Sequence, residues 1–315
     1  MKITELKYPH DFNKEDFPPS VLALGFFDGV HKGHQELINT AVEKARETGL
    51  NSAVMTFYPH PSVVLKKQEQ HVAYITPMRE KQQVLEELGV EQLFIVKFDE
   101  QLADLLPQEF VDHFLIQLNV RHVVAGFDYS YGRMGRGNME TLPFHSRGMF
   151  DQTVIDKVED HGEKISSTRI RRELKQGNME EVARLLARPF STYGKVVQGD
   201  QRGRTIGFPT ANIALNEDYL LPKVGVYAVR VKYKGKLYQG MANLGFKPTF
   251  NEEAEKPNLE VYIFDFSGNI YNEGIDVYWH AFIRDEKKFN GVDALVEQLK
   301  QDERNIRQFF VENMN

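Results

Sequence analysis

The chain changes character along its length, and this change constrains the fold more than any other feature of the sequence. In the first half, short apolar runs such as 21–25 and 53–57 alternate with segments such as 37–45, whose apolar residues recur at helical spacing. Alternation of strands and helices is typical of parallel strands joined by crossover helices. We therefore predict that the first half is an α/β domain with a doubly wound parallel sheet.

The second half has a different pattern. Past Arg188, short β-type runs are separated by turn signals, at 195–197, 227–231, 259–264 and 275–279. This spacing is typical of an antiparallel β-barrel or sandwich. A single apolar stripe with helical spacing, at 292–310, predicts a C-terminal helix. We place the boundary after residue 186, which predicts domains 1–186 and 187–315.

Charge and cysteine content exclude several classes of protein. The 315 residues include 39 basic and 45 acidic side chains, a net charge of −6, which disfavours binding to nucleic-acid backbone. The chain has 0 Cys, which removes disulfides and thiolate zinc sites and fits a reducing compartment. No apolar run approaches the roughly 18 residues of a membrane-spanning helix, and no signal peptide is visible. We expect a cytoplasmic protein without nucleic-acid or membrane partners and leave its oligomeric state open.

The segment 25–34, GFFDGVHKGH, joins the first predicted strand to the first predicted helix. Such a turn lies where open α/β sheets bind ligands, and the amides of a helix N-terminus favour anions. His31 and His34 are three residues apart, so one helical turn places both rings on the same side. There they can donate hydrogen bonds to a phosphate. Two alternatives stay open: ordinary polar residues of a loop, or a metal pair, for which no third ligand stands at a suggestive spacing.

Familiar nucleotide-binding motifs are absent from the sequence. It contains no GxxxxGK[ST] P-loop. The run GRG at 135–137 lacks the third glycine and the strand–helix context of a dinucleotide fingerprint. A nucleotide would have to be bound by other means.

The segment 25–34 resembles the nucleotidyltransferase signature of the bacterial bifunctional riboflavin kinase/FAD synthetase (FMN adenylyltransferase) family. Three further segments agree with that family in order and spacing: TFYPHP at 56–61, GFDYSYG at 126–132 and ISSTRIR at 165–171. The resemblance implies that the α/β domain is nucleotidyltransferase-like and that it transfers an adenylyl group from ATP to FMN.

The same resemblance implies roles for individual residues of this domain. The implied catalytic residues are His31, His34 and Arg171. The implied ATP-binding residues are Gly25, Phe27, Asp28, Gly29, Gly33, Ser167 and Thr168. The implied flavin-binding residues are Phe57, Pro59, His60, Phe127 and Asp128, the last in the flavin or metal neighbourhood. Hydroxyls at a helix start and an arginine one turn later also suit phosphate on physical grounds. Without the family, they read as an N-cap with solvated arginines, and the aromatics as core residues.

A second candidate site lies in the β-rich half. The segment 199–212, GDQRGRTIGFPTAN, is dense in glycine, whose backbone amides can surround phosphates. The Thr210 hydroxyl and the Asn212 carbonyl are hard oxygen donors suited to Mg²⁺ carried by ATP. Glu260 alternates with apolar neighbours along a predicted strand and points away from their face. The alternatives are a long hairpin loop and a solvent-facing glutamate.

The segment 199–212 also resembles the riboflavin kinase loop of the same family, and 243–250 and 259–266 match two further kinase segments. The resemblance implies a riboflavin kinase-like barrel. In it, ATP is bound by Gly203, Gly207, Thr210 and Asn212, of which Thr210 and Asn212 also hold the metal. Glu260 is the implied general base, which takes the proton of the riboflavin hydroxyl.

Together these features predict a bifunctional enzyme of FAD biosynthesis. It would phosphorylate riboflavin to FMN with ATP and Mg²⁺, and then join FMN to the adenylyl group of a second ATP, giving FAD and pyrophosphate. A narrower alternative is a monofunctional FMN adenylyltransferase with a regulatory flavin-binding barrel. An alternative of another class is a flavin-sensing protein without turnover.

Overall fold

The computed structural model describes residues 1–65, 72–199, 202–246 and 257–313. The chain divides into two compact units, Met1–Ser167 and Thr168–Asn315, and each is described by itself. Across the described ranges, no helix combines the length and the apolar character needed to cross a membrane.

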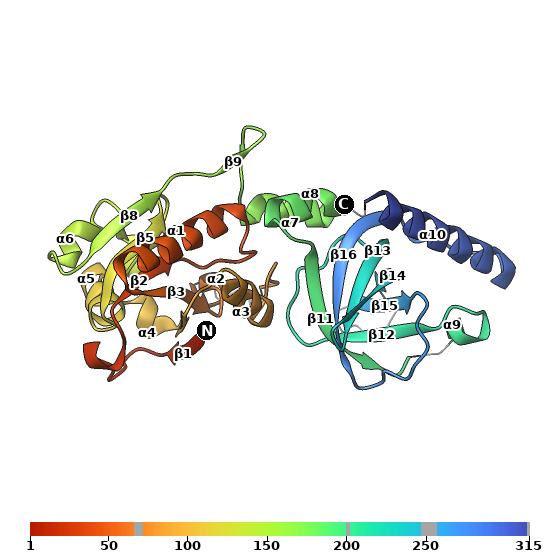
Figure 1. Ribbon diagram of the computed structural model, residues 1–315, viewed down its shortest axis with the longest axis horizontal. Helices are drawn as coiled ribbons and strands as arrows, with labels where there is room; N and C mark the ends of the chain where they lie inside the picture. Colours follow the sequence, from red (N-terminus) through yellow and green to blue (C-terminus); the bar gives the residue numbers. More distant parts are fainter. Residues whose placement is uncertain (66–71, 200–201, 247–256, 314–315) are drawn as a thin grey trace. The chain divides into compact units, whose positions relative to one another are not determined.

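The first unit is built on a six-stranded parallel sheet with the order β1-β4-β3-β2-β5-β8 (Figure 1). Its strands are β1 (Lys2–Leu6), β2 (Ser20–Leu24), β3 (Asn51–Tyr58), β4 (Gln92–Lys97), β5 (Val120–Gly126) and β8 (Asp151–Ile155). From β2 the chain moves outward through β3 to β4, and then resumes on the other side of β2 with β5. The topological switch point, where such sheets bind ligands, therefore lies beside β2.

Strand β2 illustrates how the sheet is covered on both faces. Successive side chains of a strand point to opposite faces. Leu22 packs in the core cluster that contains Phe110, whereas Val21 packs in the cluster that contains Ile38. All five residues of β2 are buried, as expected for a parallel strand with helices on both sides. The predicted doubly wound sheet is confirmed.

Helices connect these strands. They are α1 (Lys32–Thr48), α2 (Pro61–Leu65), α3 (Met78–Glu87), α4 (Glu100–Ala103), α5 (Pro107–Val111) and α6 (Leu142–Ser146). Shorter elements are the helical turns η1 (Lys14–Asp16), η2 (Asp112–Ile116, a π-helix) and η3 (Arg133–Gly135), and the strand pairs β6 (Ser130–Tyr131) with β7 (Gly137–Asn138) and β9 (Glu159–Asp160) with β10 (Glu163–Lys164). Helix α1 ends at Gly49, whose φ of 67° forms a left-handed C-cap.

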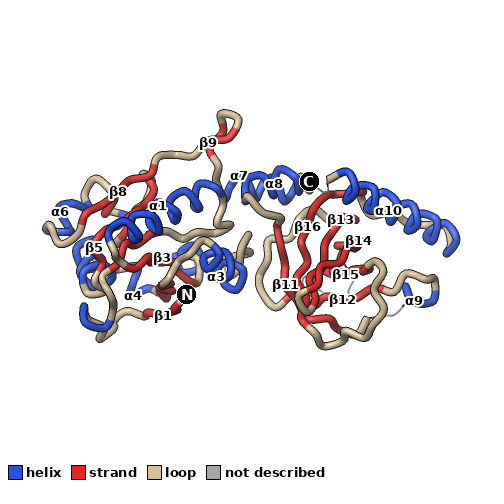
Figure 2. Tube along the Cα trace, in the orientation of Figure 1, coloured by secondary structure: helices blue, strands red, loops and turns tan. Residues whose placement is uncertain are grey.

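The second unit is a closed antiparallel barrel with the order β11-β12-β15-β14-β13-β16 (Figure 2). Its strands are β11 (Phe190–Val197), β12 (Thr210–Leu215), β13 (Gly225–Tyr233), β14 (Lys236–Phe246), β15 (Pro257–Ile263) and β16 (Gly274–Arg284). Its helices are α7 (Ser167–Gln176, whose first residue belongs to the first unit), α8 (Met179–Leu186), α9 (Arg202–Thr205) and α10 (Val292–Glu312). The predicted barrel and C-terminal helix are confirmed.

Two helices pack against the barrel wall. Ile306 and Phe310 of α10 join Ala228 and Met241 in one core cluster. Helix α8 packs against β11 and β16. The predicted boundary after residue 186 falls at the end of α8, which lies within the second unit, and that boundary stays a prediction.

Candidate active sites

The turn between β2 and α1 has an unusual backbone. Phe27, Gly29 and Val30 have φ values of 55°, 91° and 40°, in the left-handed region that non-glycine residues rarely adopt. The side chains of Phe27 and Val30 are fully buried in the core cluster that contains Ile38. A Cβ atom at Gly25 would lie 2.8 Å from the Phe27 ring. Core packing therefore holds the turn in a conformation that costs energy on its own.

His31 and His34 stand together at the start of α1. His31 is the N-cap, and its Nδ1 accepts a hydrogen bond of 3.3 Å from the His34 backbone N–H. The two rings stack with their centroids 3.6 Å apart and their planes at 15°, so they lie on the same side of the helix start, as predicted. Because Nδ1 accepts, a neutral His31 ring carries its proton on Nε2 and offers an N–H donor there.

Asp28 and Ser167 tie distant segments to this turn. Asp28 is buried, and its Oδ1 accepts hydrogen bonds from the amides of Ile75 at 3.0 Å and Thr76 at 3.1 Å. The Asp28 carbonyl accepts a hydrogen bond of 2.8 Å from the Ser167 hydroxyl. The fold thus brings two predicted ATP-binding residues together. Thr168 is exposed and Arg171 half-buried on α7 in the second unit, and their roles stay predictions.

The predicted flavin-binding residues in and after β3 occupy two environments. Phe57 is only 8 % exposed and packs against Phe110, so most of its ring is used in the hydrophobic core. His60 lies edge-on to Phe26, with 4.4 Å between the ring centroids. Pro59, half-buried, precedes it. Pro59 and His60 directly follow the last residue of β3 and so lie beyond the carboxyl end of that strand.

Phe127 and Asp128 follow β5. Lys164 of β10 forms an ion pair with Asp128 and lies 4.9 Å from the centroid of the Phe127 ring. Phe127 is 47 % exposed, which leaves an aromatic face accessible to a planar ligand. Because β3, β2 and β5 are neighbours in a parallel sheet, the segments after them gather at one edge.

A buried charge under this edge was not predicted from the sequence. Lys81 of α3 is 2 % exposed, and its Nζ donates hydrogen bonds to the Phe26 carbonyl at 2.8 Å and the Thr56 hydroxyl at 3.2 Å. Burial lowers the pKa of Lys81 to about 8, while the charge of Asp28 acts in the opposite direction. The sequence did contain one indication that Lys81 is buried. It precedes Leu85 by four residues, which places it on the apolar face of the helix.

The second candidate site lies on the barrel strands β12 and β15. Glu260 stands opposite Asn212 in the register of the two strands. Its Oε2 accepts a hydrogen bond of 3.3 Å from the Thr210 hydroxyl, and its Oε1 accepts one of 2.8 Å from the Asn258 side-chain amide. The fold therefore gathers Thr210, Asn212 and Glu260, and adds Asn258, which was not predicted.

Glycines allow close backbone approaches in the loop before β12. A Cβ atom at Gly199 would lie 2.1 Å from the Asn212 Nδ2, and one at Gly203 would lie 2.2 Å from the Phe208 carbonyl oxygen. Gly207 has a φ of 86°. The Phe208 amide donates a hydrogen bond of 2.9 Å to the Gly203 carbonyl, so this loop folds back on itself directly before Thr210. Residues 200–201 and 247–250 of the predicted kinase segments lie outside the described residues.

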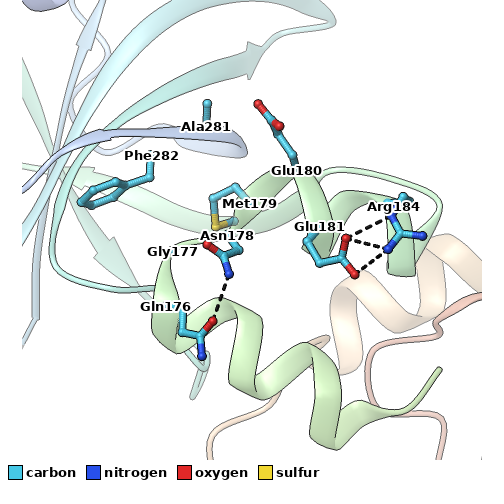
Figure 3. A pocket seen from close by; sticks show the side chains of 9 residues that line it. All are labelled: Gln176, Gly177, Asn178, Met179, Glu180, Glu181, Arg184, Ala281 and Phe282. Atoms are coloured by element: carbon cyan, nitrogen blue, oxygen red, sulfur yellow. Dashed lines mark hydrogen bonds and ion pairs between the residues drawn. The ribbon is translucent and has the colours of Figure 1, made fainter. Parts of the chain in front are cut away.

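Figure 3 shows a hollow of about 570 Å³ between the α7–α8 turn and β16. Its lining includes Phe282, the Asn178 amide and the ion pair between Glu181 and Arg184. None of the residues predicted for the two sites lines it. The hollow is therefore distinct from both candidate sites.

Comparison with known proteins matches each half of the chain separately. The family model for FAD synthetase matches residues 13–169, and the model for riboflavin kinase matches residues 186–310. Proteins named bifunctional riboflavin kinase/FMN adenylyltransferase are 48 % identical in Listeria monocytogenes and 46 % identical in Bacillus subtilis, each over 98 % of both chains. The Escherichia coli K12 protein of that name is 37 % identical over 96 % of both chains.

A solved structure agrees with the fold over the whole chain. The crystal structure described as a macrolide-efflux protein from Streptococcus pneumoniae has a TM-score of 0.89 and 39 % identity, and the match covers 98 % of this chain and 99 % of that one.

Proposed function

This chain belongs to the bifunctional riboflavin kinase/FMN adenylyltransferase family, and we propose how its side chains divide the two reactions between two sites. The enzyme phosphorylates riboflavin to FMN and adenylylates FMN to FAD. One observation supports the assignment of residues: each family model covers one cluster of polar side chains. The FAD synthetase model covers the stacked His31 and His34, and the riboflavin kinase model covers Glu260 with Thr210.

Glu260 is the general base of the kinase reaction. An alcohol is a weak nucleophile, and a carboxylate within hydrogen-bond reach takes its proton as the oxygen attacks the γ-phosphorus of ATP. The new bond joins the riboflavin 5′-oxygen to phosphorus, and ADP leaves. Hydrogen bonds from Thr210 and Asn258 to the two carboxylate oxygens fix the orientation of Glu260.

Thr210 and Asn212 suit a divalent cation carried by ATP. Their hydroxyl and amide oxygens are hard donors of the kind that Mg²⁺ prefers, and Mg²⁺ would neutralise charge on the phosphates. The absence of a side chain at Gly199 leaves room for the Asn212 amide, since a Cβ there would lie 2.1 Å from its nitrogen. The residues present therefore fit a shared metal–nucleotide site.

The β2–α1 turn binds the second ATP for adenylyl transfer. An oxygen of the FMN phosphate attacks the α-phosphorus directly, and pyrophosphate leaves without a covalent enzyme intermediate. His31 and His34 donate hydrogen bonds to the charge that develops on the phosphates, and Ser167, Thr168 and Arg171 add donors from α7. Catalysis rests on positioning and charge neutralisation.

The flavin of FMN occupies the same edge of the sheet. Pro59, His60 and the exposed ring of Phe127 offer it apolar and aromatic surface after β3 and β5. Asp128, already paired with Lys164, lies beside that ring.

Separation of the products made from riboflavin and ATP tests this division. We expect His31→Ala to lower FAD formation by roughly 10²-fold or more while FMN formation stays unchanged. Glu260→Ala has the reverse effect, with loss of FMN formation from riboflavin and normal FAD formation from supplied FMN. If either variant lost both activities while remaining folded, the assignment of residues to two independent sites would be wrong.

A further inference from the structure

Lys81 is a buried cation that neither proposed reaction uses directly. It lies on α3, is 2 % exposed, and donates from Nζ to the Phe26 carbonyl at 2.8 Å and the Thr56 hydroxyl at 3.2 Å. A lysine is rarely buried this completely unless it is paired and hydrogen-bonded. One of its two acceptors, the Phe26 carbonyl, belongs to the last residue before the strained part of the β2–α1 turn.

The Phe26 carbonyl accepts two hydrogen bonds, one from Lys81 and one of 2.8 Å from Thr56, which is fully buried. The C=O and N–H of a trans peptide point in opposite directions. Fixing the Phe26 carbonyl on Lys81 therefore turns the Phe27 N–H away from α3. Phe27 is the first turn residue with positive φ, so this one carbonyl sets the direction in which the turn begins.

A second tie runs between the same two elements. Asp28 Oδ1 accepts hydrogen bonds from Ile75 and Thr76, which directly precede α3. The segment 75–81 thus holds two residues of the turn. The ammonium group of Lys81 binds the Phe26 carbonyl, and the amides of Ile75 and Thr76 bind the Asp28 carboxylate. Two buried, oppositely charged side chains, Lys81 and Asp28, therefore connect the turn to the segment 75–81.

We propose that Lys81 is a positioning residue for adenylyl transfer, which holds the Phe26 carbonyl so that the Phe27 amide and the histidines after it meet the phosphates of ATP. Lys81 itself does not contact substrate, because its side chain is buried beneath the turn. The inference rests on the proposed role of the turn in binding ATP.

The first test compares two variants of α3. Lys81→Met keeps most of the aliphatic volume and removes the donor. Leu85→Ala is the control, because Leu85 is fully buried on the same helix and packs in the core. We expect Lys81→Met to lower the kcat of FAD formation from FMN and ATP by roughly 10- to 100-fold, with a smaller change in KM for ATP. Leu85→Ala lowers the melting temperature but keeps kcat per folded molecule, and riboflavin phosphorylation is unchanged in both.

The second test needs only the unmodified enzyme. Burial lowers the pKa of Lys81 to about 8, and the charge of Asp28 on the turn opposes this shift. The Arg79–Glu80 ion pair precedes Lys81 on α3. Below that pKa the ammonium charge strengthens the bond to Phe26, and above it the charge is lost. The rate of adenylyl transfer therefore falls as pH rises through about 8, and Lys81→Met lacks this alkaline decrease.

Three results would overturn the inference. One is a kcat of Lys81→Met equal to that of the unmodified enzyme. Another is a decrease in the rate of FAD formation by Lys81→Met that is fully explained by a smaller folded fraction, as expected for Leu85→Ala. The last is a flat rate of adenylyl transfer between about pH 7 and 9.5 in the unmodified enzyme, which decides the question even if Lys81→Met does not fold. His31→Ala separates the two proposals: if it leaves FAD formation intact, the site assignment itself is wrong.

Discussion

Single residues in this enzyme act through partners that lie far away in the sequence. Glu260 is held by Asn258 on its own strand and by Thr210 on the neighbouring strand, and the Phe26 carbonyl by Lys81 and Thr56. Glu260 and Thr210 were predicted because their segments resemble those of the family, and their roles stay predictions. The sequence could not predict Lys81, because a lysine in an amphipathic helix is usually solvated and only the fold places the Phe26 carbonyl above it.

Asn258 is expected to matter for the kinase reaction alone. Asn258→Leu removes the amide that donates to Glu260 Oε1. The carboxylate then keeps one of the two hydrogen bonds that orient it, the one from Thr210. A hydrogen bond to a charged group contributes about 1.5–3 kcal/mol, so we expect riboflavin phosphorylation to slow by roughly 10- to 100-fold. Steady-state rates of FMN formation measure this, with FAD formation from FMN as the internal control. An unchanged kinase rate would show that Thr210 suffices to orient the base.

His280 is expected to make the second unit sensitive to acid. Its ring packs edge-on against Phe310, and burial, helped by the charge of Arg230, lowers its pKa to about 4. An unfolded histidine titrates near 6.5, so between pH 6.5 and 4 the unfolded chain takes up a proton first and stability falls as pH falls. We expect the free energy of unfolding to be about 1 kcal/mol lower at pH 5 than at pH 7. This is less than the full pKa difference would give, because the ring is partly solvated. Thermal inactivation of the kinase at the two pH values measures the change.

The matched variant for this measurement is His280→Gln, which cannot take up the proton. Its inactivation temperature is expected to change less between pH 7 and pH 5 than that of the unmodified enzyme. The same acid dependence in both proteins would assign the effect to other groups.

At the scale of elements, interior strands were predictable and edges were not. The apolar run 21–25 corresponds to β2, in which all five residues are buried. The edge strand β1 has a single buried residue, Leu6, so its sequence carries little apolar signal. Whether the second half forms a barrel or a sandwich depends on the pairing of β11 with β16. These segments lie roughly 80 to 90 residues apart, and local patterns do not encode their pairing. The helical stretch 107–116 is divided into α5 and the π-helical turn η2.

The glycine-rich loop before β12 is expected to tolerate no side chain at Gly203. In Gly203→Ala the new Cβ would lie 2.2 Å from the Phe208 carbonyl oxygen, so the loop must open. We expect kcat/KM for ATP in riboflavin phosphorylation to fall roughly tenfold or more, and FAD formation from FMN to stay unchanged.

Gly235→Ala is the control in the same unit. Gly235 has a φ of 79° but nothing within 4 Å of its added Cβ, so that variant loses about 1 kcal/mol of stability and keeps its activity. Equal kinetic effects of the two substitutions would mean that the Gly203 contact has no special importance for ATP.

At the scale of the whole molecule, the two clusters of polar side chains fall under different family models, the histidines under that for FAD synthetase and Glu260 under that for riboflavin kinase. The stacked histidines belong to the first unit and the Glu260 carboxylate to the second. If the two sites share no catalytic side chain, as proposed, each is expected to be inactivated without loss of the other. FMN released by one chain is then expected to be a substrate for another.

Mixing two inactivated enzymes tests this claim most directly. Supplied with riboflavin and ATP, His31→Ala should stop at FMN, and Glu260→Ala should leave riboflavin unchanged. An equimolar mixture of the two should form FAD, because FMN made by the first variant is adenylylated by the second. A mixture that forms no FAD, although each variant keeps its remaining activity when assayed separately, would contradict two independent sites connected by free FMN.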